Sequence, residues 1–444
     1  MIKRIAIIGA GPSGCALAIM LAQRGVECII FDNNKQTDLL VGESLVPAAM
    51  PIIKRLGIED QIAQFSQRKE GAALRSGKTR VNFAFRKLGK DVPAYAYNVP
   101  RPQFDTVLRK RAKNLGVTFI TQSAQIETIA DNKIRDIQLS IESLRAAKLS
   151  RETEPDLLID ATGRTRLFSR LLKLDSKRGP RNDVSHFAHF KNFSSDSQLN
   201  GQIVITVLKN GWAWQIPLPD RTSVGVVMDG KAFNQYGKTA EERLENVIAD
   251  NPELNNKKFE RISNVKTYAN YQLISEQAHG KGWALVGDAL GFVDPMLSPG
   301  VFMALESANL LDKHLFSQPS INNHQIVKSL DTYFNEIQHW HTSWSTLIQY
   351  FYDGRLLSLS DKRPQFENGS FRYYPAKLID NMIGYMLAQL VSGAKTRSTL
   401  YQFSLRTICT LMCQNDQHTS QYAIKNNRGQ QLHDNNGQLK KIQI

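Results

Sequence analysis

The feature that most constrains this chain is a glycine-rich turn between a strand and a helix within its first 32 residues. KRIAIIGAG indicates an apolar strand, SGCALAIMLAQRG a helix that stops at Gly25, and VECIIFD a second strand. The turn GAGPSG has G-x-G-x-x-G spacing, which permits a tight turn and a close approach of backbone to a diphosphate. We therefore predict a dinucleotide-binding βαβ unit with the positive end of the helix facing the phosphates. The residues expected at the dinucleotide are Gly9, Gly11, Pro12, Ser13 and Gly14 in the turn, and Asp32, which would accept hydrogen bonds from a ribose.

Composition places the chain among folded globular proteins. Its 444 residues, 42% of them hydrophobic, suffice for one large core or for two to three domains. The apolar runs are too short to span a bilayer and the four cysteines form no metal-ligand pattern, so we expect a cytoplasmic protein without a metal or a membrane span. The net charge of +15 suits solubility, or attraction to an anionic substrate, an acidic protein or a membrane surface; no nucleic-acid-binding motif accompanies it.

Two later segments indicate which dinucleotide is bound. PDLLIDATGR (155–164) is a strand followed by a turn, and residues 280–311 predict a strand ending at Gly287 and Asp288, a loop and a long helix. With the N-terminal turn, this order resembles the FAD-dependent monooxygenases of the aromatic-hydroxylase fold over about residues 1–310. The resemblance implies FAD, held also by Asp160, Gly163, Asp288, Pro295, Gly300 and Val301. No second G-x-G-x-x-G occurs, so electrons would come from transient contact with NAD(P)H or from a separate flavin reductase.

Three shorter segments narrow the resemblance. GESLVP (42–47), GWAWQIP (211–217) and FVDPMLSPG (292–300) are similar to the flavin-dependent halogenase branch and its hydroxylating relatives, including flavoproteins of tryptophylquinone maturation. In that branch the W-x-W-x-I-P segment keeps the substrate away from the flavin. The resemblance therefore implies catalytic roles for Trp212, Trp214 and Ser298, and contact with the cofactor for Glu43 and Ser44. From the strand period alone, both indoles lie on one face, either as a wall beside the flavin or as core aromatics between sheet and FAD domain.

Basic and imidazole side chains supply further candidates. The resemblance suggests Lys69 as the lysine at the end of a tunnel for hypohalous acid, where its ammonium would orient electrophilic halogen; the alternative is a solvated loop lysine. It places Arg101 near the flavin, with a helix-start arginine that bridges two domains as the alternative. His186 and His189 fall on a strand of the predicted substrate sheet. His189 is a candidate base, although a satisfied core histidine is the commoner state.

The predicted architecture is α/β, or α+β in its layers. It comprises a Rossmann-like FAD-binding domain with a parallel sheet, an antiparallel or mixed substrate-binding sheet and a helical C-terminal region. The expected limits are 1–180 and 265–330 for the discontinuous FAD domain, 181–264 with part of 70–100 for the substrate sheet, and 331–444 for the helical region with its mobile polar tail. Helical spacing of aromatics predicts a core stripe, or a roof over the substrate, formed by Trp340, Trp344, Phe351 and Tyr352.

These observations predict an enzyme, an FAD-dependent oxidoreductase. We expect a monooxygenase that uses reduced flavin and dioxygen to hydroxylate an electron-rich indole- or phenol-type aromatic, with a tryptophan inside a peptide or protein as one candidate. Three features favour this reaction. Leu297 stands where tryptophan halogenases carry a glutamate just before the motif serine, the serine-proline-glycine turn departs from the pattern of phenol halogenases, and the basic charge suits a larger partner. Phenol-type halogenases also lack that glutamate, so Leu297 does not exclude halogenation. Halogenation through hypohalous acid is the first alternative, supported by W-x-W-x-I-P and Lys69. A reductase or saturase of the geranylgeranyl-reductase type, and a flavin-binding chaperone without turnover, are further alternatives.

Overall fold

A computed structural model describes residues 2–34, 39–77, 79–85, 91–129, 134–193, 201–254, 259–269, 272–316, 323–361, 373–413 and 423–424. In these residues the chain combines parallel and mixed sheets with helices, which confirms the α/β class. The polar tail predicted from Asn415 falls outside the described residues, apart from residues 423–424. The domain limits set out above stay predictions.

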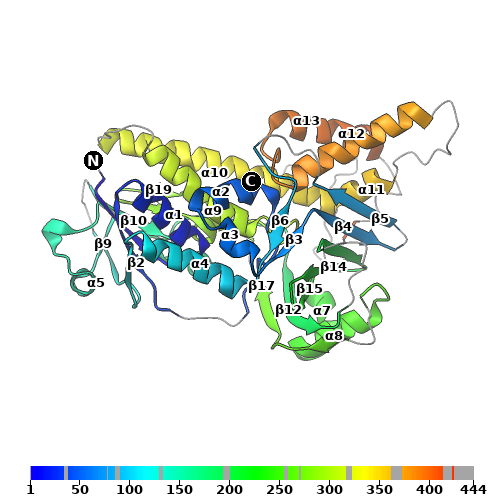
Figure 1. Ribbon diagram of the computed structural model, residues 1–444, viewed down its shortest axis with the longest axis horizontal. Coiled ribbons are helices and arrows are strands. Elements are labelled where there is room, and N and C mark those ends of the chain that lie inside the picture. The colour runs from blue at the N-terminus through cyan, green and yellow to red at the C-terminus, as the bar shows by residue number, and fades with distance from the viewer. Residues whose placement is uncertain are drawn as a thin grey trace.

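A six-stranded, mainly parallel sheet is built on the N-terminal βαβ unit (Figure 1). Its strands, in sheet order, are β19 (His279–Gly280), β20 (Trp283–Leu285), β10 (Leu157–Asp160), β1 (Arg4–Ile8), β2 (Glu27–Phe31) and β7 (Thr118–Ile120). Ile8 at the end of β1 lies beside Phe31 and Asp160 at the ends of its two neighbours. The carboxyl ends of these parallel strands thus meet at one edge, where open α/β sheets bind their ligands.

Helices cover this sheet and carry the apolar runs that the sequence shows. Helix α1 (Pro12–Gln23) packs between α4 (Arg101–Asn114) and α9 (Gly300–Leu315). Residues 13–21 of α1 are buried without exception, so this helix lies inside the molecule and not on its surface. The shorter elements beside it are η1 (Pro47–Ala49), α2 (Met50–Leu56), α3 (Glu59–Ala63), η3 (Gly163–Thr165), α6 (Leu167–Leu171) and η6 (Gly287–Ala289).

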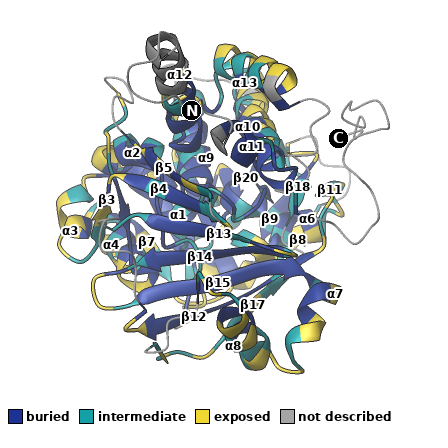
Figure 2. Ribbon diagram, turned by 90° about the vertical axis from the view of Figure 1, so that its right-hand side faces the viewer, coloured by how far each residue is buried: buried dark blue, intermediate teal, exposed yellow. Residues whose placement is uncertain are grey.

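A second, eight-stranded sheet is largely antiparallel. Its strands are β16 (Glu260–Arg261), β12 (Asp183–Lys191), β15 (Thr222–Asp229), β14 (Gly211–Pro217), β13 (Ile203–Leu208), β4 (Gly71–Ser76) and β5 (Thr79–Ala84) in order, with β17 (Lys266–Ala269) also paired to β12. Figure 2 shows β12, β14 and β15 buried along most of their length. Helices α7 (Gly230–Phe233) and α8 (Ala240–Asp250), with η5 (Asn234–Tyr236), cover one face, and the other face joins the main core.

The C-terminal region is helical, as its residue spacing predicts. Helix α10 (Asn323–Tyr352) packs on α9 and runs along the top of the molecule toward the second sheet (Figure 1). It is followed by α11 (Arg355–Asp361), α12 (Tyr373–Val391) and α13 (Thr399–Cys413). In the described ranges no helix combines the length and the apolar character that crossing a membrane requires.

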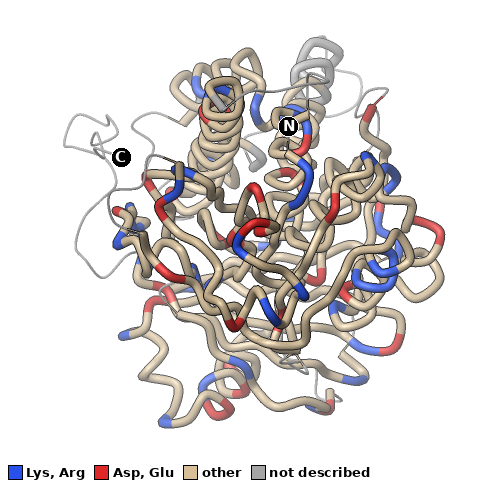
Figure 3. The backbone as a smooth tube through the Cα atoms, turned by 90° about the vertical axis from the view of Figure 1, so that its left-hand side faces the viewer, with Lys and Arg blue, Asp and Glu red and all other residues tan. Residues whose placement is uncertain are grey.

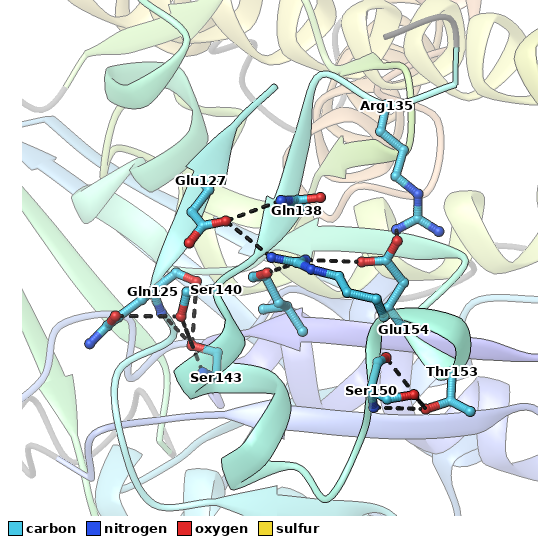
Figure 4. A network of polar contacts seen from close by, with 11 residues as sticks. Gln125, Glu127, Arg135, Gln138, Ser140, Ser143, Ser150, Thr153 and Glu154 are labelled. Carbon is cyan, nitrogen blue, oxygen red and sulfur yellow. Dashed lines mark hydrogen bonds and ion pairs between the residues drawn. The ribbon is translucent and has the colours of Figure 1, made fainter. Parts of the chain in front are cut away.

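A small polar lobe lies at the opposite end of the molecule from α12 and α13 (Figure 1). It contains β8 (Ile126–Thr128), β9 (Ile137–Leu139), α5 (Ile141–Ala146) and η2 (Arg151–Thr153). Arg151 ties it together by donating to the Leu139 carbonyl at 2.7 Å and pairing with Glu127 at 3.1 Å, beside the serine and glutamate contacts drawn in Figure 4. These contacts serve the lobe itself and lie away from the edge where the glycine turn sits.

The remaining strands are short and hold loops near that edge. β3 (Gln67–Lys69) pairs with β6 (Ala96–Asn98), and β18 (Leu273–Ser275) pairs with β11 (Ser176–Arg178) and β21 (Gly291–Phe292). Lys69 lies opposite Ala96 in the first pair, and a single bridge joins Ser44 to Asn98. The segment GESLVP is thereby fixed next to the strand that carries Lys69.

Candidate active site

The glycine turn after β1 leaves the space that a diphosphate needs. Gly9 has φ +108°, and a Cβ there would lie 2.4 Å from the Ala161 carbonyl oxygen. A Cβ on Gly14 would lie 2.1 Å from the Gly9 carbonyl oxygen, so only glycine permits this packing of helix on strand. A Cβ on Gly11 would meet no described atom within 4 Å, which leaves open space at the N-terminus of α1. This arrangement fits a dinucleotide diphosphate.

Asp32 braces the same turn. Its Oδ2 accepts the backbone N–H of Ala10 at 2.8 Å and pairs with Arg109 at 3.0 Å, and its Oδ1 accepts from the backbone of Asn34 at 2.6 Å. The carboxylate therefore lies at the carboxyl edge of the parallel sheet beside the predicted diphosphate site. Its contact with a ribose stays a prediction.

Asp160 shapes the second loop at this edge. Oδ1 accepts from the backbone and hydroxyl of Thr162 at 2.9 and 2.6 Å, and Oδ2 accepts from the backbone of Phe168 at 2.7 Å. Both carboxylate oxygens thus already serve the turn that carries Gly163. Direct contact of Asp160 with FAD stays a prediction, and the geometry makes it a residue that positions the loop.

The loop Gly42–Ser44 brings three distant segments together. Glu43 Oε1 accepts a hydrogen bond from Nε2 of His189 at 2.8 Å, and Lys69 donates from Nζ to the Ser44 hydroxyl. Arg101 donates to the Val41 carbonyl and pairs with Asp105 at 3.1 Å. The predicted cofactor residues Glu43 and Ser44 are therefore in direct contact with the predicted catalytic lysine and the candidate base.

Lys69 is a buried amine and not a solvated loop lysine. Only 2% of its surface is exposed, and its Nζ lies 5.9 Å from the centre of the Phe85 ring. Burial disfavours the charged ammonium and lowers the pKa of Lys69 to about 7. A substantial fraction of this amine is therefore uncharged near neutral pH.

Arg101 meets the N-terminus of α9 across Gly42. A Cβ on Gly42 would lie 2.8 Å from the Arg101 guanidinium and 3.1 Å from the Val301 side chain, so these groups converge on the glycine. Asp288 lies within the electrostatic reach of Arg101. Burial raises the pKa of Asp288 to about 6, and the charges of Arg101 and Arg164 oppose that rise. The predicted residues Arg101, Asp288 and Val301 thus border one region.

Trp212 and Trp214 lie on the same face of β14, as the strand period predicts. Their ring centroids are 5.8 Å apart, and both belong to the main core together with Ile216, whereas Ala213 faces the opposite cluster. Trp214 donates to the Ser223 hydroxyl at 3.3 Å and fills the space beside Gly225, where a Cβ would lie 2.2 Å from its ring. The two indoles form a fixed wall that faces the helices.

A buried relay holds the first indole. Trp212 Nε1 donates to the Tyr352 hydroxyl at 2.9 Å, and that hydroxyl lies 3.2 Å from both carboxyl oxygens of Asp294. Because an indole N–H can only donate, the tyrosine proton points to Asp294. Burial raises the pKa of Asp294 to about 7, so a substantial fraction of this acid is protonated near neutral pH.

The loop before α9 is strained next to this relay. Leu297 and Ser298 have φ +65° and +58°, the left-handed region that non-glycine residues rarely enter. Asp294 accepts from the backbone of Met296 at 2.8 Å, and Ser298 donates its N–H to the Pro295 carbonyl at 3.1 Å. Strain of this kind is concentrated at functional sites. The catalytic role of Ser298 and the cofactor contacts of Pro295 and Gly300 stay predictions.

The sequence analysis did not identify Asp294 and Tyr352 as polar partners within this site. Asp294 stands inside the quoted motif FVDPMLSPG, where an acid between apolar residues was a signal of buried chemistry. Tyr352 was included only in the aromatic roof. The structure makes Trp340 and Trp344 core residues against Phe302 of α9, at ring distances of 4.9 and 6.4 Å, and gives Tyr352 the polar contact.

Comparison with known proteins identifies relatives over most of the chain. Residues 67–355 match the family described as tryptophan halogenase. The 1H-pyrrole-2-carbonyl-[peptidyl-carrier protein] chlorinase of Pseudomonas fluorescens is 28% identical over 76% of this chain and 81% of its own. Tryptophan 2-halogenase of Chondromyces crocatus is 29% identical over 69% of this chain, but the matched part spans only 60% of that relative.

Solved structures share the fold. A flavoprotein/dehydrogenase from Cytophaga hutchinsonii superimposes with a TM-score of 0.72 at 23% identity, covering 91% of this chain and 98% of that one. Halogenase PltM in complex with phloroglucinol and FAD gives 0.66 at 18% identity, covering 93% and 91%. FAD as the cofactor agrees with these relatives and with the glycine turn. They support the halogenase alternative better than the oxygenation that Leu297 favoured.

Replacing Gly11 by valine should separate cofactor binding from folding. A valine side chain would project into the open space at the helix N-terminus, so we expect at least about a tenfold loss of bound flavin. The free energy of unfolding of the flavin-free protein should change by less than about 1 kcal/mol. Visible flavin absorbance after gel filtration and urea unfolding measure the two quantities. Gly14→Ala is the contrasting variant, because its Cβ would clash with the Gly9 carbonyl and destabilise the fold itself. Stoichiometric flavin in Gly11→Val protein would contradict the assignment.

Asp294 should leave a signature in the pH dependence of stability. Its pKa of about 7 in the folded chain exceeds the ordinary value of the unfolded chain, so the folded state holds a proton that the unfolded state loses near pH 4. This contribution is fully present below pH 4 and is lost as pH rises to about 7. Relative to Asp294→Asn, the natural protein should lose roughly 1.4 kcal/mol per pH unit inside that window. Urea unfolding from pH 4.5 to 8 tests this, and parallel profiles of the two proteins would contradict it.

Proposed function

The chain belongs to the tryptophan halogenase family, and on that premise we propose that it is a flavin-dependent halogenase acting on an electron-rich aromatic. The observation that carries the proposal is the buried Lys69 amine, bonded to Ser44 beside the tryptophan-lined sheet. When bound, reduced FAD with dioxygen supplies the oxidising equivalent that turns halide into electrophilic halogen. The residues of the chain bind the cofactor, keep the path dry and direct the halogen to carbon.

Lys69 is suited to receive electrophilic halogen. Its ammonium form donates hydrogen bonds to hypohalite, and its neutral form, populated because the pKa lies at about 7, offers a lone pair to the halogen. The Ser44 hydroxyl holds the amine on one side, and the apolar surroundings exclude the water that would disperse a hypohalous acid. A solvent-exposed lysine would do neither.

In this proposal the rings of Trp212 and Trp214 keep the aromatic substrate at a distance from the flavin. Trp212 is held through Tyr352 to Asp294, and Trp214 through Ser223, so neither ring is free to swing away. Both indoles are at most 4% exposed, which makes the wall dry as well as rigid. In this proposal an aromatic substrate meets halogen at Lys69 and not the flavin itself, so direct oxygen transfer is suppressed.

The substrate is proposed as a pyrrole, phenol or indole ring, free or attached to a larger carrier. The carrier-bound pyrrole of one relative and the tryptophan of another define this range. A separate flavin reductase is proposed as the electron donor, because the sequence has no second dinucleotide motif. Figure 3 shows Lys and Arg positions interleaved with Asp and Glu positions along the backbone on the side it displays.

A product-mass measurement tests the proposal. The purified protein, FAD, a flavin reductase, NADH, oxygen and bromide are incubated with pyrrole, phenol or indole, and a thioether scavenger removes hypobromous acid that escapes into solution. We expect products with the paired mass peaks of bromine. A gain of one oxygen would instead establish hydroxylation, and turnover without oxygen would establish the reductase alternative.

Lys69→Met, a similar-sized side chain without an amine, should abolish bromination. We expect at least about a hundredfold loss of brominated product while bound flavin and NADH consumption persist, because only the halogen-directing group is removed. Arg68→Ala is the matched control from the same strand, since the Arg68 side chain is 53% exposed. Equal bromination by the natural and Lys69→Met proteins would refute the role of the amine.

A further inference from the structure

The geometry points to the Glu43–His189 pair as the proton acceptor of the halogenation step, with His189 receiving the hydrogen that the aromatic carbon loses. This inference rests on the proposed halogenase function. Replacement of an aromatic hydrogen by halogen releases a proton, yet the residue before Ser298 is Leu297, which cannot accept it. His189 is a base that the fold places close to Lys69, because its partner Glu43 precedes the Ser44 hydroxyl that accepts from the Lys69 amine.

His189 lies between the lysine and the tryptophan wall. On one side its partner Glu43 precedes Ser44, the residue to which Lys69 donates. On the other side His189 pairs across the sheet with Ser223, whose hydroxyl accepts the indole N–H of Trp214 at 3.3 Å. These contacts therefore link the Lys69 amine, the His189 imidazole and the Trp214 indole in sequence.

The face of strand β12 supports this placement. Phe187, two residues before His189, has its ring 5.8 Å from that of Trp214 and belongs to the main core. The alternate residues Ala188 and Phe190 belong to the opposite cluster under α8. His189 thus points to the side of the sheet on which the tryptophans and Glu43 lie.

Glu43 sets the reactive nitrogen of the imidazole. Glu43 Oε1 lies 2.8 Å from Nε2, and a carboxylate only accepts hydrogen bonds, so Nε2 carries the proton and Nδ1 keeps its lone pair. Among the described residues Nδ1 has no hydrogen-bond partner, and 9% of the side chain remains accessible. The pair has the arrangement in which a carboxylate orients a histidine base and stabilises the imidazolium it becomes.

The proposed step balances as follows. Hypohalous acid, formed from halide, dioxygen and reduced FAD, or the N-halo amine that it forms on Lys69, supplies the halogen. The aromatic π electrons form the carbon–halogen bond, and the halogen–oxygen or halogen–nitrogen bond breaks with its electron pair left on oxygen or nitrogen. The C–H electron pair then restores aromaticity as the proton moves to Nδ1 of His189. Glu43 stabilises the resulting imidazolium, which returns its proton to the hydroxide or amine left behind.

His186 provides an internal contrast on the same strand. Its Nδ1 lies 2.8 Å from the Thr267 hydroxyl, and its ring packs 4.5 Å from that of Phe233 in the opposite cluster. Both histidines are buried, at 2% and 7% exposure, so their substitutions perturb the strand to a comparable extent. Only His189 contacts the loop that holds Lys69, and His186 therefore serves as the matched control.

The test is a hydrogen isotope effect on bromination. His189→Gln and His186→Gln holoenzymes are compared with the natural protein, using the most productive of pyrrole, phenol and indole in ring-protonated and ring-deuterated forms, with the scavenger present. The natural protein and His186→Gln should show isotope effects near 1, because deprotonation follows a slower step. His189→Gln should be at least about tenfold slower with an isotope effect of about 2 or more, since proton loss becomes limiting.

Two further variants keep the result interpretable. His189→Ala should regain part of its rate with added imidazole, and Glu43→Gln should show a smaller rate loss than His189→Gln; far-UV circular dichroism and the urea midpoint report that each variant is folded. Full bromination by His189→Gln, or a slow rate with an isotope effect near 1, overturns the inference. Absence of brominated product from the natural protein overturns the halogenase proposal itself, so the two failures are distinct.

Discussion

Burial of one lysine amine against one serine hydroxyl is the contact on which the candidate site depends. Lys69 lies on a three-residue strand, and Ser44 lies on a loop bridged to the partner strand. Removing an ammonium from water is costly, and burial therefore lowers the pKa of Lys69 to about 7, near the pH of the solution. An amine in that state is both a hydrogen-bond donor and a nucleophile, which is the combination that the proposed halogen-directing role of Lys69 uses.

Burial also explains the state of the acid joined to the tryptophan wall through Tyr352. Burial raises the pKa of Asp294 as it lowers that of Lys69, and both shifts favour uncharged forms. A buried indole N–H needs an acceptor, and Tyr352 supplies one while passing its own proton to Asp294. The relay therefore fixes the wall and the strained loop before α9, beside the buried Arg181–Asp183 ion pair that stacks on Tyr352. Buried polar chains whose members are hydrogen-bonded rigidify a site.

Local patterns predicted the elements well, because their causes are local. The G-x-G-x-x-G turn, the helix after it and the alternation in GWAWQIP each depend on residues within a few positions, and the structure has all three. The preference for oxygenation rested on Leu297, on the serine-proline-glycine turn and on the basic composition, and the relatives support halogenation better. The contact of His189 with Glu43 spans 146 positions, and no local pattern reports such a pair.

The sequence by itself determined a dinucleotide-type glycine turn, an α/β class and two indoles on one strand face, whereas FAD and the role of Lys69 came from the resemblance to a family. Only the tertiary structure decided that this lysine is buried on Ser44, that Glu43 orients His189, and that Tyr352 joins Trp212 to Asp294. The physical reason for this division is that secondary-structure propensity, hydrophobic periodicity and backbone sterics depend on residues close together in sequence. Burial and hydrogen-bond pairing, which set the protonation of Lys69 and Asp294, exist only once segments far apart in sequence have packed together.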